Sequence, residues 1–301
     1  MIVYSQLGKR GNLGNQMFQI ASTVGLAKRY NHVFFFPKWE YACFFEYELP
    51  IYSNDERFIT IKEKEFNYHE WNISNSNYDL IGWLQTEKYF DIPMTRKIFK
   101  FKNDFAKSIV DNYQFIFEKK TILVSVRRGD FVNNPHFFQI SYKFYILALI
   151  NNFSDFKERT IVFVSDDIGY CKFHYSFLKN AVFLENSHPM EQMVIGSKCD
   201  DFVISNSTFS WWIAWLGEKE GTRIYRPTKN LRGNFAIQNN DKDFFPERWI
   251  SFSENDYTLP IEYYYLIIKG EFYNISVNGK YFYKITLKKI KKVVKKIIRR
   301  E

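Results

Sequence analysis

The sequence has few cysteines, and no apolar run in it is long enough to cross a bilayer. The three cysteines, Cys43, Cys171 and Cys199, are odd in number and widely separated, which argues against a disulfide framework or a zinc site. Residues 1–4 show no basic start leading into an apolar signal core, and they predict a first strand instead. These absences exclude a membrane-spanning or disulfide-stabilised class, and they predict a protein of the cytoplasm.

Net charge is also scarce outside the C-terminal segment. The 301-residue chain has a formal net charge of +9, but residues 281–301 alone contain nine Lys or Arg and one Glu, a net charge of +8. A nucleic-acid-binding protein would carry its basic face on the folded body. No nucleic-acid partner is therefore expected. The hydrophobic content of 46% excludes disorder for most of the chain, and the length allows two domains.

The basic residues of 281–301 are interleaved with apolar residues at spacings of three and four. The apolar positions are Leu287, Ile290, Val293, Val294, Ile297 and Ile298. One apolar face beside basic faces predicts an amphipathic helix that binds an anionic membrane surface. Each basic residue near such a surface contributes on the order of 1 kcal/mol. The alternative is a terminal helix that packs on the protein's own core and turns its basic side to solvent.

Short apolar segments alternate with helix-like segments in the second half of the chain. The predicted strands are 121–126, 160–165, 181–185, 201–205 and 222–226. The predicted helices are 141–151, 168–178, 190–198 and 208–217. Such alternation predicts a parallel sheet with right-handed crossovers.

The first half is less regular. It predicts strands at 2–6, 33–36 and 78–84, with a glycine-rich turn and a helix over 15–30 between the first two. No element is predicted for the tyrosine-rich segment 255–280, which has no clear period. We place the domains at 1–118, 119–260 and 261–301.

Two adjacent arginines and an aspartate follow the predicted strand 121–126. Ligands of open α/β sheets bind just beyond the carboxyl ends of the strands. The planar guanidinium suits a diphosphate because it makes two parallel charge-assisted hydrogen bonds. Arg127, Arg128 and Asp130 are therefore candidates for an anion site. The alternative is a charged loop in solvent.

Two further predicted strands also end in polar residues. Asp166 and Asp167 follow the strand 160–165, and Asn206, Ser207 and Thr208 follow the strand 201–205. Helix capping explains any one of them. It does not explain why three strand ends of one sheet all present ligand-competent residues. Their convergence predicts a nucleotide site.

Two other segments give weaker signals. The glycine-rich turn over residues 8–16 permits close backbone approach to a ligand, but a tight strand–helix connection explains it equally well. Asp241-Lys242-Asp243 matches a metal-binding DxD pattern. No strand is predicted before it, so we interpret it as a solvated loop.

Together these segments resemble the α-1,2-fucosyltransferases of glycosyltransferase family 11. Four blocks carry the resemblance: residues 11–19 (GNLGNQMFQ), 82–90 (GWLQTEKYF), 127–130 (RRGD) and 204–216 (ISNSTFSWWIAWL). The last block is long and highly specific. The blocks occur in the order and context of that family, and together they span roughly residues 1–250.

The resemblance implies an α/β fold of GT-B type, in which two Rossmann-like domains face a cleft. The basic helix predicted from the spacing of residues 281–301 would follow them. Residues 1–118 would form the acceptor side, and residues 119–260 would hold the donor GDP-fucose. The implied reaction is an inverting transfer of fucose to the 2-hydroxyl of a galactose, with no required metal or other cofactor. The expected acceptor is a galactose-containing oligosaccharide, free or lipid-linked, in bacterial surface polysaccharide synthesis.

The resemblance also implies roles for particular residues. The donor-binding set is Asn15, Arg127, Arg128, Asp166, Asp167, Asn206, Ser207 and Thr208. Arg127 would hold the diphosphate and offset the charge that builds on the leaving GDP. Arg128 would be a second contact or a structural ion-pair partner. Ser207 and Thr208 would lie by the phosphates, Asp166 or Asp167 near the guanosine, and Asn15 across the cleft by the sugar.

The sequence leaves the identity of the catalytic base open. Asp130 is a candidate because a carboxylate near the reacting hydroxyl can accept its proton, but it could equally orient the arginines. The chain also departs from the family pattern, with Ser125 where a histidine is common and Asn230 where a tryptophan is usual. The alternatives are a related transferase with another nucleotide-sugar donor, or a non-catalytic membrane-binding or nucleic-acid-binding protein that uses the basic tail.

Overall fold

The computed structural model describes residues 1–52 and 57–298. In the last helix, the side chains of 281, 282, 285, 286 and 288–298 lie outside the description. Residues 1–254 form one compact unit, and residues 255–301 form a second. Both sheets lie in the first unit, so the predicted boundary at 118 remains a prediction, as does the one at 260.

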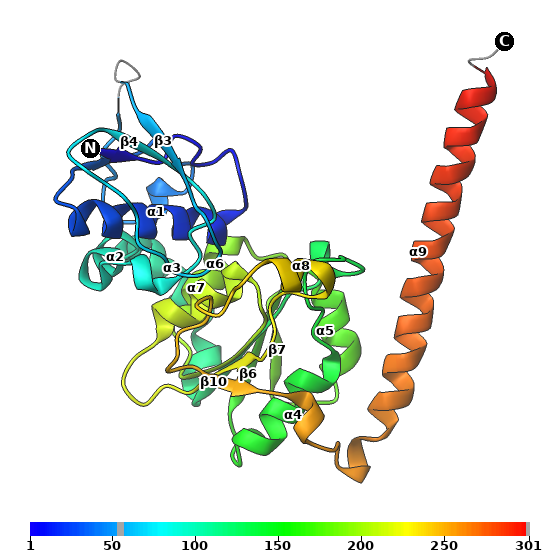
Figure 1. Ribbon diagram of the computed structural model, residues 1–301. Helices are drawn as coiled ribbons and strands as arrows, with labels where there is room; N and C mark the ends of the chain where they lie inside the picture. The colour runs from blue at the N-terminus through cyan, green and yellow to red at the C-terminus, as the bar shows by residue number, and fades with distance from the viewer. Residues whose placement is uncertain (53–56, 299–301) are drawn as a thin grey trace. The chain divides into compact units, whose positions relative to one another are not determined.

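The N-terminal sheet consists of short parallel strands in the order β2-β1-β4-β3. Figure 1 labels β3 and β4 of this sheet. Its members are β1 (Ile2–Val3), β2 (Phe34–Phe35), β3 (Ile59–Lys62) and β4 (Tyr78–Ile81). Strand β1 pairs with both β2 and β4, so that Ile2 faces Phe34 on one side and Tyr78 on the other. The first strand therefore lies inside the sheet, with its carboxyl end beside that of β4.

The larger sheet is also parallel throughout and has the order β10-β9-β8-β5-β6-β7. Its strands are β5 (Thr121–Val126), β6 (Thr160–Ser165), β7 (Ala181–Phe183), β8 (Asp201–Ile204), β9 (Ile224–Pro227) and β10 (Ile250–Phe252). All six residues of β5 are buried, as expected for a central strand covered on both faces. The chain winds outward from β5 in one direction and then, from β8, in the other. The pair β5/β8 is therefore the topological switch point, where open α/β sheets bind ligands.

Helices connect these strands. Their bounds are α1 (Leu13–Arg29), α2 (Ile92–Ile98), α3 (Asn103–Asn112), α4 (Tyr142–Asn152), α5 (Ile168–Tyr175), α6 (Pro189–Ser197), α7 (Thr208–Gly217), α8 (Gly233–Gln238) and α9 (Tyr265–Ile298). The predicted class is confirmed: the fold is α/β with two parallel sheets and a C-terminal helix.

The agreement with the sequence predictions is closest in the larger sheet. Strands β5 and β6 and helix α7 have the predicted bounds. The strand predicted over 78–84 ends at Ile81, because Leu84 has a φ of 55° and turns the chain. The prediction omitted β3, α2, α3, α8 and β10. Strand β3 lies at a sheet edge with little burial, so it lacks the apolar pattern of a buried strand.

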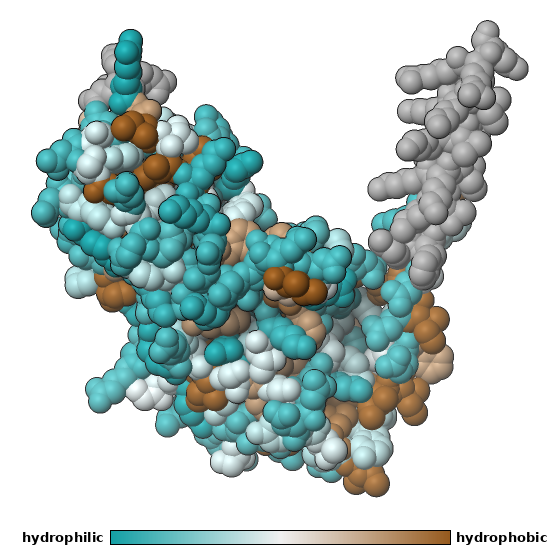
Figure 2. All heavy atoms as spheres, viewed as in Figure 1, coloured by the Kyte–Doolittle hydropathy of each residue, from teal (hydrophilic) through white to brown (hydrophobic). Residues whose placement is uncertain are grey.

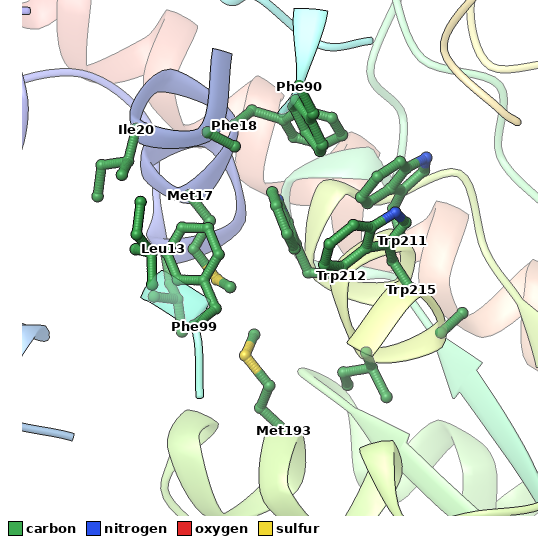
Figure 3. Packing of buried hydrophobic residues seen from close by; sticks show 14 of the residues in the cluster. Leu13, Met17, Phe18, Ile20, Phe90, Phe99, Met193, Trp211, Trp212 and Trp215 are labelled. Carbon is green, nitrogen blue, oxygen red and sulfur yellow. The ribbon is translucent and has the colours of Figure 1, made fainter. Parts of the chain in front are cut away.

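An aromatic cluster packs α7 against α1. Phe18 of α1 lies 4.5 Å from the ring of Trp211 and 5.2 Å from that of Trp212, measured between centroids (Figure 3). The indole N–H of Trp212 donates to the backbone oxygen of Gly14 over 2.9 Å. The indole N–H of Trp215 donates to Glu87 over 2.6 Å. The indoles thus supply large apolar area while their polar atoms stay satisfied.

The beginning of α1 touches the beginning of α7. A Cβ atom at Gly14 would lie 2.6 Å from the backbone carbon of Thr208 and 2.7 Å from the nitrogen of Phe209. A side chain at this position would push the two helices apart. Gly14 therefore permits the approach that brings residues of both halves of the unit to one place.

The C-terminal unit contains α9, a helix of 34 residues. The predicted helical backbone of the basic tail is confirmed up to Ile298, but most of its side chains lie outside the described residues. The helix begins well before 281, in the segment for which no element was predicted. Ile268, Phe272 and Ile275 are at least 63% exposed there. Figure 2 shows hydrophobic residues in brown near the base of this helix. Over the part of the chain that the structure describes, we find no helix with the length and apolar content to cross a bilayer.

Candidate active site

A cavity of about 710 Å³ opens at the carboxyl ends of the larger sheet's strands. Arg127 follows β5, Asp166 follows β6, and Ser207 follows β8, and all three line it. Asn15 of α1 lines the same cavity from the N-terminal half. The volume is that of a typical small-molecule site. The cavity therefore lies at the switch point between β5 and β8, with one wall from each half of the unit.

Most of the predicted binding residues meet in this cavity. Those that line it are Asn15, Arg127, Asp130, Asp166, Asn206, Ser207 and Thr208. Arg128 and Asp167 are not among the described residues that line it. The Arg128 guanidinium lies 4.0 Å from the centroid of the Tyr170 ring, and its Nε lies 3.8 Å from Asp167. Asp167 also caps α5 by accepting the N–H of Tyr170 over 3.1 Å. Both side chains thus have structural partners, and the ligand contacts predicted for them remain predictions.

Arg127 is held between two carboxylates. Its Nη2 and Nε lie 2.6 and 3.1 Å from Asp130 Oδ1, and its Nη1 lies 3.1 Å from Asp166 Oδ2. The other oxygen of Asp166 accepts the backbone N–H of Arg128 over 2.9 Å. A Cβ at Gly129 would lie 2.2 Å from Asp166 Oδ2. Glycine therefore follows the arginines because the carboxylate of Asp166 occupies the space of a side chain.

The start of α7 forms the next part of the wall. Ser207 caps this helix by accepting the N–H of Phe209 over 3.2 Å. Helix N-termini attract anions because their first N–H groups lack partners within the helix. Asn206 has a structural role as well, since its amide donates to the backbone oxygens of Phe138 and Asn230, both over 2.9 Å. It fixes two loops on the β9 side of the cavity.

A cluster of hydroxyls lies between β5 and α7. The Ser125 and Ser205 hydroxyls each lie 2.7 Å from that of Ser210, and all three residues are buried. Ser125 and Ser210 also line the cavity. Ser125 is thus tied to the junction of β8 and α7.

Asn15 is oriented from two sides. Its Oδ1 accepts a hydrogen bond from Gln85 Nε2 over 2.8 Å. Gly11, with a φ of 76°, lies so close that a Cβ there would be 2.6 Å from the Cβ of Asn15. Gln16 in turn donates to the backbone oxygen of Gly11 over 2.9 Å. The glycine-rich turn thus positions a cavity residue.

The sequence reasoning missed several cavity residues. Gln85 lies in the block 82–90, but no role was assigned to it. Residues of the loop after β7 and of the start of α6 also line the cavity. They are Leu184, Asn186, Ser187, Pro189 and Gln192. The strand-end argument, applied to β7, would have found it. Asn230 and Asp241, beyond β9, complete the opposite side.

The interpretation of Asp241-Lys242-Asp243 as a solvated loop is wrong. Asp243 is only 9% exposed, and its carboxylate pairs with Lys88 over 2.6 Å and accepts the N–H of Tyr68 over 3.0 Å. Asp241 lines the cavity. The loop packs because the N-terminal half supplies partners that lie more than 150 positions earlier in the chain.

Known proteins resemble this chain over much of its length. The family model "Glycosyl transferase family 11" matches residues 5–253. The O-antigen biosynthesis glycosyltransferase WbnK of Escherichia coli is 26% identical over 213 residues, which cover 62% of this chain and 70% of that protein. An alpha-1,2-colitosyltransferase of Escherichia coli is 29% identical over 185 residues, 57% of this chain and 61% of that protein. The crystal structure of fucosyltransferase NodZ from Bradyrhizobium superposes with a TM-score of 0.46 at 14% identity, covering 71% of this chain and 92% of that one.

Glu63 supports the cavity wall from behind. Its carboxylate accepts the backbone N–H groups of Trp83 and Leu84 over 2.7 and 3.0 Å, and Trp83 lines the cavity. Burial raises the pKa of Glu63 to about 7, and the two N–H donors offset only part of that rise. The carboxyl therefore holds its proton up to nearly neutral pH.

This proton makes the stability of the protein depend on pH. The pKa of Glu63 rises from 4.5 to about 7 on folding, so its contribution to stability is lost as pH rises through that window. We expect the unfolding free energy of Glu63→Gln, relative to wild type, to increase by on the order of 2 kcal/mol between pH 5 and pH 8. Urea unfolding across this range measures it, with Glu158→Gln at an exposed position as the control. A difference that stays constant with pH would refute the assignment.

Proposed function

The chain belongs to glycosyl transferase family 11, and on that basis we propose that it transfers fucose from GDP-fucose to the 2-hydroxyl of a galactose in a glycan. The observation that carries the proposal is the placement of Arg127. Two carboxylates hold it at the β5/β8 switch point, in a cavity with walls from both halves of the unit. This position suits a nucleotide diphosphate.

In this proposal Arg127 binds the donor diphosphate. As the bond to the sugar breaks, negative charge grows on the leaving GDP, and a guanidinium already in place stabilises that charge. The start of α7, with Ser207 and Thr208, lies on the other side of the phosphates and adds N–H and hydroxyl donors. The arginine and the helix supply the offsetting charge, so the reaction requires no metal.

The contacts of Asp130 favour one of its two predicted roles. Its Oδ1 already accepts two hydrogen bonds from Arg127, and the side chain is 60% exposed. We therefore assign Asp130 to the orientation of Arg127. Asp166 shares that task from the β6 side, where the guanosine would lie.

The acceptor approaches from the N-terminal half in this proposal. Asn15, fixed by Gln85, faces the sugar across the cavity. An acceptor in surface polysaccharide synthesis, free or lipid-linked, accords with the similarity to a protein named for O-antigen biosynthesis. The similarity to an alpha-1,2-colitosyltransferase favours a second candidate, the same linkage with colitose as the transferred sugar.

The purified protein should convert GDP-fucose and a galactose-terminated oligosaccharide into GDP and a product fucosylated at the galactose 2-hydroxyl. NMR of the product identifies the linkage, and parallel reactions contain EDTA or replace the donor with GDP-colitose. We expect transfer from GDP-fucose with and without EDTA. Transfer from GDP-colitose alone would establish the second candidate. The absence of transfer, donor hydrolysis and GDP binding would overturn the proposal.

Arg127→Ala should lower kcat by at least about 100-fold, the usual effect of removing one donor that stabilises transition-state charge. Circular dichroism and the melting temperature should stay close to those of the wild type, because the side chain lies at the cavity wall. Arg57→Ala, an exposed arginine outside the cavity, controls for the loss of a positive charge. Near-normal transfer by a folded Arg127→Ala protein would contradict the diphosphate role.

We also propose that residues 281–301 bind an anionic membrane surface, on the charge and spacing of their sequence. The helical backbone of α9 suits such binding. Membrane binding by this segment would bring the enzyme to a lipid-linked acceptor, and the segment would take no part in the chemistry.

A chain truncated after residue 280 should keep its kcat and KM on soluble acceptors. It should lose binding to vesicles that contain phosphatidylserine, because the removed residues carry nearly all the net charge. Co-sedimentation with anionic and neutral vesicles, at low and high salt, measures the binding. Equal sedimentation of both chains would contradict the membrane address, and lost transfer to soluble acceptors would favour a helix that packs on the enzyme.

A further inference from the structure

Three acidic residues line the cavity in the described part of the chain: Asp130, Asp166 and Asp241. The first two are occupied, because both contact the guanidinium of Arg127. Neither can take a proton without weakening the group that would hold the diphosphate. Asp241 forms no ion pair with any described residue, so its carboxylate is the remaining candidate for proton transfer.

Asp241 lies beside neutral donors. The side chain of Asn230 and the backbone N–H of Leu231 lie near its carboxylate and lower its pKa. The backbone oxygen of Asn230 accepts the amide of Asn206 over 2.9 Å, which ties this group to the end of β8. Burial raises the pKa of Asp241, and the neutral donors offset only part of the rise. A carboxylate in such surroundings is a stronger base than one exposed to water.

The order of the strands places Asn230, which lines the cavity together with Asp241, on the far side of Arg127 from Asp166. Arg127 ends β5, Asp166 ends β6, and Asn230 lies just beyond β9, in the strand order β9-β8-β5-β6. Neighbouring strands are about 4.8 Å apart, so the ends of β5 and β9 are roughly 10 Å apart. An inverting transfer needs the base within about 3 Å of a hydroxyl that attacks the sugar opposite the leaving phosphate. A separation of this size leaves room for one sugar between Arg127 and the β9 side of the cavity, where Asn230 lies.

We propose that Asp241 is the general base of the transfer reaction, an assignment that rests on the proposed function. The oxygen of the acceptor hydroxyl forms a bond to the anomeric carbon of the donor sugar. The bond from that carbon to the diphosphate oxygen breaks, and its electron pair leaves with GDP beside Arg127. The hydroxyl proton passes to the carboxylate of Asp241. Asp130, three residues after Arg127, stays paired with its guanidinium throughout.

Matched substitutions separate the two carboxylates. Asp241→Asn should lower kcat by about 100-fold or more, the usual range for a lost general base, while GDP affinity from calorimetry stays within about twofold. Asp241→Glu should retain measurable transfer. Asp130→Asn should instead weaken GDP binding and raise the donor KM, because Arg127 loses its orientation. Thermal melting confirms that each variant is folded.

Rescue by a small carboxylate distinguishes a base from a structural residue. In Asp241→Ala, formate can enter the vacated space and accept the proton, so we expect added formate to restore transfer several-fold. Formate should not restore Asp130→Ala. Loss of transfer without rescue, or loss of GDP binding by Asp241→Asn, would make Asp241 structural.

The failure of each proposal has its own signature. Near-normal kcat in a folded Asp241→Asn protein, beside an active wild type, would overturn the assignment of the base alone. A wild-type protein that transfers from neither GDP-fucose nor GDP-colitose would overturn the proposed function, and the base with it.

Discussion

The close contact between the starts of α1 and α7 is the constraint on which the rest of the structure depends. Gly14 presents its backbone to Thr208 at a distance that excludes any side chain, and Trp212 donates to the oxygen of the same glycine. The aromatic cluster next to this contact consists of large buried rings. Its indole N–H groups are hydrogen-bonded as well. The cavity exists because this contact brings Asn15 to the carboxyl ends of the larger sheet.

A second constraint concerns the positive charge of Arg127 in the cavity, which needs partners that keep the guanidinium in place. Arg127 is positioned by Asp130 and Asp166, and Gly129 leaves the space that Asp166 requires. In the proposed function the two carboxylates orient the guanidinium but also neutralise part of its attraction for phosphate. The start of α7 would supply further, neutral donors. Among the described residues that line the cavity, Asp241 is left as the carboxylate that forms no ion pair.

The predictability of the elements followed the depth of their burial. Strand β5 lies in the centre of the larger sheet and helix α7 is largely buried, and continuous apolar sequence predicted the bounds of both. Strand β3 at a sheet edge, and the tyrosine-rich start of α9, carry no such pattern. Asp243 was misread for a related reason. Its partners Lys88 and Tyr68 come from the other half of the unit, so local sequence suggests a solvated loop.

The sequence by itself determined the fold class, the family and seven of the residues that line the cavity, because strand ends and motif blocks are local patterns. It also placed the basic charge in the C-terminal segment. Only the tertiary structure decided what each polar residue does, because hydrogen bonds join positions far apart in the chain. It placed Arg128 and Asp167 in structural contacts, bound Asp130 to Arg127, and brought Asp241 to the cavity beside Asn230. A carboxylate's neighbours, rather than its place in a motif, set the proton affinity on which such a role depends.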